Sequence, residues 1–177
     1  MMQANPDGKH CHETLTTFGE KAFGEWHGLA PDCKLSELAR LWPVADAGAM
    51  LGPLGSEHRA TSYDYYEVPG YAQPVRVWHV RGNIIEMDVE DPLPGQSAAT
   101  LLNQLGAPDV KTDVHYGYAH FHEGEWFYGR RGLSLLYVAQ EDRFQALAVF
   151  PPTTLAHYSQ RLRIERGARP MPKGDRL

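Results

Sequence analysis

Short segments of alternating apolar and polar residues, each ended by a tight-turn signal, constrain this chain more than any other feature of its sequence. Three of them follow one another at residues 59–68, 73–81 and 83–89. They are rich in β-branched and aromatic residues, and the pairs Pro69-Gly70 and Gly82-Asn83 lie between them. Alternate side chains of a strand face opposite sides of a sheet, and such short turns join antiparallel neighbours. The pattern therefore predicts a three-stranded antiparallel meander.

The second half of the chain has the same character. Further strands are predicted at residues 110–121, 125–129, 133–139 and 143–150. Helices are predicted at residues 13–26, 34–41, 98–105 and 154–164, with a helical turn within residues 45–55. Asp32 is the expected N-cap of the second of these helices. The sequence thus predicts an α+β fold in which a curved antiparallel sheet of about seven strands is flanked by helices.

The length of 177 residues matches a single domain. We expect residues 13–166 to form it, with a disordered tail at 1–12 and a loose basic tail at 167–177, because both ends are polar and aperiodic. Each half also contains a helix with a Leu-Gly end, an aromatic strand and an Arg-Gly turn. This order indicates two tandem helix-sheet repeats, residues 32–92 and 93–166, or else a coincidence that any α+β protein built of meanders can produce.

Charge is divided unevenly along the chain. Residues 1–156 contain 11 basic and 20 acidic side chains, whereas residues 157–177 contain 6 basic and 2 acidic ones. An acidic body argues against nucleic acid as a partner, because binding to phosphates depends on lysine and arginine. No apolar run approaches the roughly 18 residues of a membrane span, and residues 1–12 lack the apolar stretch of a signal peptide. We therefore expect a cytoplasmic protein that binds neither nucleic acid nor a membrane.

The sequence contains no complete metal site and none of the usual enzyme fingerprints. Its two cysteines, Cys11 and Cys33, are too few for a four-ligand zinc site, and we expect both to be free thiols. One candidate for metal chemistry is formed by His120 and His122 on one strand face, with His79 as a third ligand. A surface strand that happens to carry imidazoles explains the same pattern, so we expect no metal and no cofactor.

Carboxylates and tyrosines gather on the predicted strands. Glu86 and Asp88 alternate with apolar residues, which predicts a solvated row of carboxylates on one face of their strand. Tyrosines among such carboxylates have the composition of a protein-binding surface, because tyrosine and tryptophan dominate binding hot spots. The predicted partner-binding residues are Tyr63, Asp64, Tyr65, Glu86, Asp88, Tyr116, Tyr118 and Trp126. The alternative is that the rings pack in the core and the carboxylates are simply solvated.

Two resemblances bear on function. The order of helix, Leu-Gly end and aromatic meander over residues 38–150 resembles the repeats of the β-lactamase inhibitory protein and of related small outer-membrane assembly lipoproteins. Separately, AFGEWHGLAPDC at 22–33 and VPGYAQPVRVW at 68–78 are similar to stretches of the immunity proteins that accompany polymorphic bacterial toxins. Both resemblances imply a protein that binds and blocks another protein.

We therefore expect a cytoplasmic immunity protein that is not an enzyme and that neutralises a cognate toxin by occluding its active site. The acidic body favours a basic toxin as the partner, because complementary charge accelerates association. Two alternatives remain at this stage. One is an enzyme of unrecognised type with a histidine-centred site at His120 and His122. The other is an assembly module that binds a peptide at a sheet edge.

Overall fold

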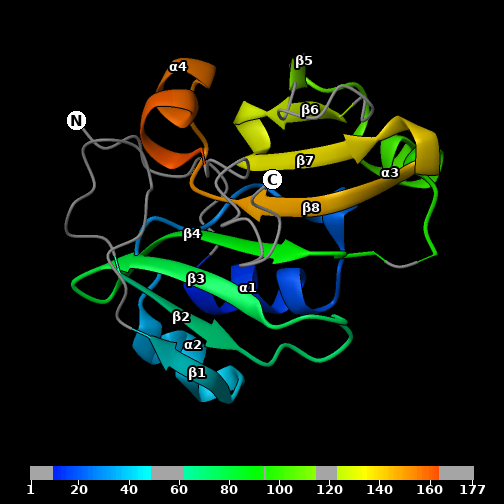
Figure 1. Ribbon diagram of the computed structural model, residues 1–177. Coiled ribbons are helices and arrows are strands. Elements are labelled where there is room, and N and C mark those ends of the chain that lie inside the picture. The colour runs from blue at the N-terminus through cyan, green and yellow to red at the C-terminus, as the bar shows by residue number, and fades with distance from the viewer. Residues whose placement is uncertain (1–9, 49–61, 94, 115–122, 164–177) are drawn as a thin grey trace, which may run out of the picture.

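An eight-stranded antiparallel sheet forms the centre of the protein, seen in a computed structural model that describes residues 10–48, 62–93, 95–114 and 123–163. The strands run in the order β1-β2-β3-β4-β8-β7-β6-β5, so β1 and β5 are the edges of an open sheet (Figure 1). They are β1 (Val44–Gly48), β2 (Ser62–Tyr66), β3 (Val75–Val80), β4 (Asn83–Glu90), β5 (Val110–Val114), β6 (Glu123–Tyr128), β7 (Leu133–Val138) and β8 (Arg143–Val149). The predicted α+β fold with an antiparallel sheet is confirmed.

Helices cover both faces of the sheet, but unequally. Three helices pack on one side: α1 (Cys11–Gly19), α2 (Leu35–Leu41) and α3 (Ala98–Leu105). We call this side the inner face, and it holds the main apolar core. On the opposite side, the outer face, α4 (Leu155–His157) and the π-helical turn that continues it (Tyr158–Leu162) pack against β6 and β8 (Figure 1).

Several boundaries differ from those predicted. The segment at 45–48, predicted as part of a helical turn, forms the edge strand β1 and pairs with β2. Its alanine and glycine residues have no strong local preference, so pairing with β2 decides their conformation. The first helix ends at Gly19 instead of reaching residue 26, and Lys34 rather than Asp32 is the N-cap of α2. By contrast, α3 has the predicted bounds, and Ser97 Oγ accepts a hydrogen bond from the Thr100 backbone N–H at its start.

The two halves of the sheet share one pairing scheme. Helix α2 precedes the meander β1–β4, and α3 precedes the meander β5–β8. In both halves the last hairpin has a bulge at the same place: Ile85 is skipped after the pair Trp78–Glu86, and Gln145 is skipped after the pair Leu136–Ala146. This correspondence supports the tandem arrangement, while the repeat limits at 32–92 and 93–166 stay a prediction.

The two cysteines are joined, so the prediction of free thiols is wrong. Cys11 at the start of α1 and Cys33 just before α2 form a disulfide with a Cα–Cα distance of 4.9 Å. Both side chains are buried in the main core, with Cys33 fully excluded from solvent. The first helix therefore begins within residues 1–12, which were predicted to be a disordered tail. The disulfide attaches the start of this helix covalently to Cys33. No local pattern predicts this contact, because the cysteines are separated by 22 positions and tertiary packing brings them together.

Two glycines with a positive φ offer a matched test of the turns. A Cβ at Gly132 (φ +55°) would lie 1.9 Å from the Phe150 carbonyl oxygen, whereas a Cβ at Gly82 (φ +81°) would meet nothing within 4 Å. Gly82→Ala should lower the free energy of unfolding by about 1–2 kcal/mol, the cost of the left-handed conformation alone. Gly132→Ala should lower it by a further ~1–3 kcal/mol, because backbone must also move. Urea unfolding of both variants checks this, and equal losses would contradict the described turn.

Candidate functional site

A cluster of aromatic and charged side chains lies on the outer face of the first half of the sheet. Strand register places them in two rows across β2, β3 and β4: one row is Tyr63, Trp78 and Glu86, and the next is Tyr65, Arg76 and Asp88. Side chains directly opposite one another on neighbouring strands are in contact distance. We call these six residues the outer cluster.

Arg76 and Asp88 form the centre of the outer cluster. Arg76 donates from Nε to Asp88 Oδ1 at 2.9 Å and from Nη2 to Asp88 Oδ2 at 2.7 Å, which is a bidentate ion pair. Trp78 Nε1 donates a further hydrogen bond of 2.8 Å to Asp88 Oδ1. Both carboxylate oxygens of a nearly buried aspartate are thus satisfied. Burial by itself lowers the pKa of the Arg76 guanidinium, but the hydrogen bonds and charge of Asp88 outweigh it and raise that pKa.

The Arg76 guanidinium packs against two aromatic rings. Its carbon lies 5.0 Å from the centre of the Trp78 ring and 5.7 Å from that of Tyr63. Tyr63 in turn packs against Trp78 at 4.9 Å and edge-on against Tyr65 at 5.6 Å. Trp78 is buried, whereas Tyr63, Tyr65 and the Arg76 side chain stay partly exposed. The cluster therefore presents pre-positioned tyrosine and arginine groups, which need little further ordering to bind a partner.

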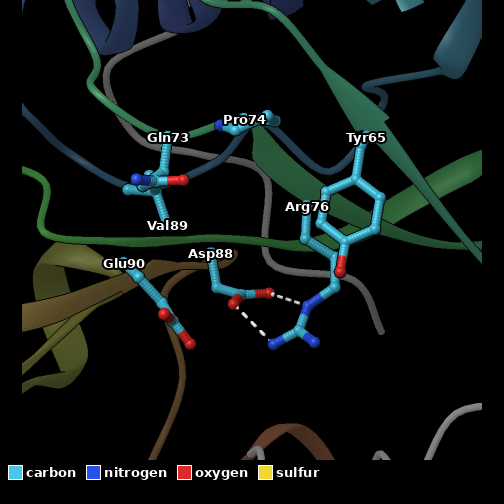
Figure 2. Close-up of a pocket in the computed structure, with 7 residues that line it drawn as sticks. All are labelled: Tyr65, Gln73, Pro74, Arg76, Asp88, Val89 and Glu90. Atoms are coloured by element: carbon cyan, nitrogen blue, oxygen red, sulfur yellow. Dashed lines mark hydrogen bonds and ion pairs between the residues drawn. The ribbon is translucent and has the colours of Figure 1, made fainter. Parts of the chain in front are cut away.

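An open pocket of about 230 Å³ adjoins the cluster. It is lined by Tyr65, Gln73, Pro74, Arg76, Asp88, Val89 and Glu90. In the view of Figure 2, Tyr65 and Arg76 stand on one side of this pocket, Gln73 and Glu90 stand on the other, and Asp88 lies between them. The Val89 side chain lies in the main core, so the pocket is lined mainly by polar and charged groups with Pro74 and the Tyr65 ring beside them.

The second half of the sheet shows what the corresponding surface becomes when a helix covers it. There Phe127 and Ala148 occupy the positions of Tyr65 and Asp88, and they pack against Tyr158 and Leu162. Figure 1 shows α4 above this second half, away from β2 and β3. The outer face is thus apolar in the half that the C-terminal helix covers, and it is polar and aromatic in the other half.

A second carboxylate, Glu125 on β6, is tied into that helical cover. Ser134 Oγ donates to Glu125 Oε1 at 2.6 Å, and the Tyr158 hydroxyl donates to the same oxygen. Arg163 Nη2 pairs with Glu125 Oε2 at 2.8 Å. Glu125 is nearly buried, and these contacts bind the end of the helix to the sheet. We assign Glu125 a structural role on this geometry.

The structure divides the predicted binding residues into separate groups. Tyr63 and Tyr65 lie side by side on the outer face, as their alternation predicted. Glu86 and Asp88 share that face, but they are 0% and 5% exposed, so the prediction of a solvated carboxylate row is wrong. The bulge at Ile85 also moves Ile84, not Ile85, to the inner core beside Met87. The predicted alternation of the two faces is correct from Glu86 onward. The burial of the polar face of this strand was not predicted.

Two of the predicted residues lie on the opposite face. Asp64 lies across from Val77, on the side of the main core, where its Oδ2 is 3.3 Å from His79 Nε2. Trp126 is 6% exposed and packs against Tyr137 and Phe144, each at 5.0 Å between ring centres. Their strand parity differs from that of the two tyrosines, so neither belongs to the outer cluster.

The remaining predictions fall beyond the described part of the chain. Tyr116, Tyr118, His120 and His122 are outside it. Within the residues that the structure describes, no group of three or more histidine, cysteine, aspartate or glutamate side chains could hold a metal ion.

Arg76 and Trp78 are the site residues that sequence reasoning missed. A signal for them existed, because a basic and an aromatic residue alternate on β3 directly opposite the acidic residues of β4. Cross-strand pairing of opposite charges is a common way to stabilise a sheet.

Comparison of the chain with protein-family models, curated proteins and solved structures finds no match. In the described ranges, none of the helices is both long enough and apolar enough to cross a membrane.

Proposed function

We propose that the chain is a binding protein whose outer cluster docks against a protein partner. The observation that carries this proposal is the Arg76–Asp88 pair framed by Tyr63, Tyr65 and Trp78. Tyrosine, tryptophan and arginine are the residues that contribute most binding energy at protein interfaces, especially where neighbours exclude water from them. Here they are held in one arrangement before any partner arrives.

The partner that fits best is a basic protein, and the role we propose is that of an immunity protein that covers the active site of a toxin. The body of the chain is acidic, and Glu90 lies exposed at the rim of the outer cluster. Charge of this sign accelerates encounter with a basic surface and disfavours acidic competitors. The resemblance of residues 22–33 and 68–78 to immunity proteins points in the same direction.

The compartment we propose differs from the cytoplasm expected from the sequence. The Cys11–Cys33 disulfide is buried in the main core. Disulfides persist in oxidising compartments and are rare in the reducing cytosol. We therefore propose that the folded protein works in an oxidising compartment, where it meets its partner.

Co-expression with the product of the adjacent gene tests the proposal directly. The chain should rescue cells from that product, and the two purified proteins should form a complex. Tyr65→Ala should weaken the complex by roughly 30-fold, the effect of truncating a central hot-spot residue. Isothermal titration calorimetry measures this change.

Tyr137→Ala is the matched control, because Tyr137 is also a partly buried tyrosine but packs against the main core in the second half. It should leave the affinity unchanged, and thermal unfolding should show both variants folded. The proposal fails if no complex forms, or if both variants weaken the complex equally.

A further inference from the structure

We infer that the pocket beside the outer cluster binds uncharged main-chain amide groups, supplied by a peptide segment of the partner. This inference deepens the proposed function and rests on it. It assigns a ligand class to the open cavity of about 230 Å³ next to Arg76. A cavity of that volume has room for several water molecules, and therefore for a short piece of main chain.

The Arg76 guanidinium has hydrogen-bond donors that the fold does not use. Arginine has five N–H donors, and Arg76 directs one from Nε and one from Nη2 to Asp88. Its other N–H groups have no acceptor in the described part of the chain. Nη1 stays accessible to solvent, and the side chain lines the pocket. These donors are therefore available to an acceptor that enters the pocket.

Two neutral side chains of the lining add further hydrogen-bonding groups. The Tyr65 hydroxyl and the Gln73 amide make no hydrogen bond with the residues that the structure describes. Figure 2 shows Tyr65 and Arg76 on one side of the pocket and Gln73 on the other. A peptide unit placed between the two sides can accept a hydrogen bond at its C=O from Arg76 or Tyr65. Its N–H can donate to the Gln73 amide oxygen.

The charges at the pocket favour an uncharged ligand. Asp88 neutralises Arg76, and its two oxygens already accept three hydrogen bonds from Arg76 and Trp78. Glu90 at the rim also has an interaction partner of its own. A bound ion would lose hydration here without gaining an unpaired charge of opposite sign. A neutral amide needs only the hydrogen-bonding groups that the pocket offers.

Nuclear magnetic resonance titration of the full chain tests this inference without the partner. The probe is N-acetyl-alanine methylamide, which has two peptide units and no charge. It should shift the side-chain signals of Gln73 and Arg76 in a saturable manner. Added salt should change its affinity by less than about twofold, because no ion pair forms. Acetate, methylguanidinium and methyl glucoside represent an anion, a cation and a sugar, and each should bind more weakly than the amide probe.

Variants connect the shifts to the pocket. Tyr65→Phe removes only the hydroxyl and should weaken probe binding by about two- to tenfold, the range of one hydrogen bond. Gln73→Ala should have a similar effect. The matched controls are Tyr137→Phe, a partly buried tyrosine outside the pocket, and Gln104→Ala, an exposed glutamine on α3. Both controls should bind the probe as the parent chain does.

The inference is overturned if the amide probe does not bind, or if acetate, methylguanidinium or methyl glucoside binds more tightly. It is also overturned if the Tyr65→Phe and Gln73→Ala variants both bind the probe as tightly as the parent chain.

This test can fail while the proposed function survives. A partner complex that is weakened by Tyr65→Ala but not by Tyr65→Phe would keep the docking face and lose only the hydrogen-bonding pocket. Absence of any partner complex would instead remove the proposed function.

Discussion

Breaking the Cys11–Cys33 disulfide should lower the free energy of unfolding by about 3 kcal/mol, the stabilisation expected for a loop of this size. The bond closes a 22-residue separation that includes α1, and it lies in the main core with Leu15 and Phe18. Urea unfolding of the oxidised protein and of the Cys11→Ala/Cys33→Ala variant measures the difference.

A reducing agent provides the control for this prediction. It should destabilise the parent protein and leave the double variant unaffected. Equal stability of the oxidised and reduced parent would contradict the disulfide, as would two thiols found by titration of the unfolded, unreduced chain.

Replacing Arg76 by alanine should lower the free energy of unfolding by about 3–5 kcal/mol, the cost of leaving one charge of a buried pair alone. Asp88 is 5% exposed and would keep only the hydrogen bond from Trp78. The side chains of the pair also form the centre of the outer cluster, so partner binding should be lost together with stability. Chemical unfolding monitored by tryptophan fluorescence measures the stability change.

Two further variants distinguish the cost of leaving Asp88 unpaired from the effect of simply removing an arginine. Arg40→Ala breaks an exposed pair with Glu37 on α2 and should cost no more than about 0.5 kcal/mol. Arg76→Met combined with Asp88→Asn removes both charges but keeps an acceptor for Trp78, and it should recover much of the stability lost in Arg76→Ala. A loss below 1 kcal/mol in Arg76→Ala would show that water reaches Asp88.

Local sequence signals predicted the structure correctly where the sequence pattern and the tertiary environment favour the same conformation. The helix at 98–105 has a capping residue and occurs as predicted. The hairpin between β3 and β4 also forms, but its two turn residues are Arg81 and Gly82, one position before the predicted pair Gly82-Asn83. Gly82 indeed adopts a positive φ. Alternation likewise placed Tyr63 and Tyr65 on one face, because side-chain direction in a strand depends only on parity.

Strand parity does not predict the environment of a side chain where the pairing register shifts, or where residues of another strand bury that side chain. The bulge at Ile85 moves Ile84 into the core, and only pairing with β3 reveals it. Asp88 reads as a surface residue in its own strand, yet Arg76 and Trp78 from the next strand enclose it. The edge strand β1 has little strand propensity of its own and depends on β2.

The sequence by itself thus determined the α+β class, the meanders and the tyrosine pair, because each follows from periodicity and turn chemistry within a few residues. Only the tertiary structure decided that Cys11 meets Cys33, that Asp88 is paired and buried, and that α4 covers one half of the outer face. These contacts join residues far apart along the chain, and their energy depends on packing and desolvation that no local pattern records.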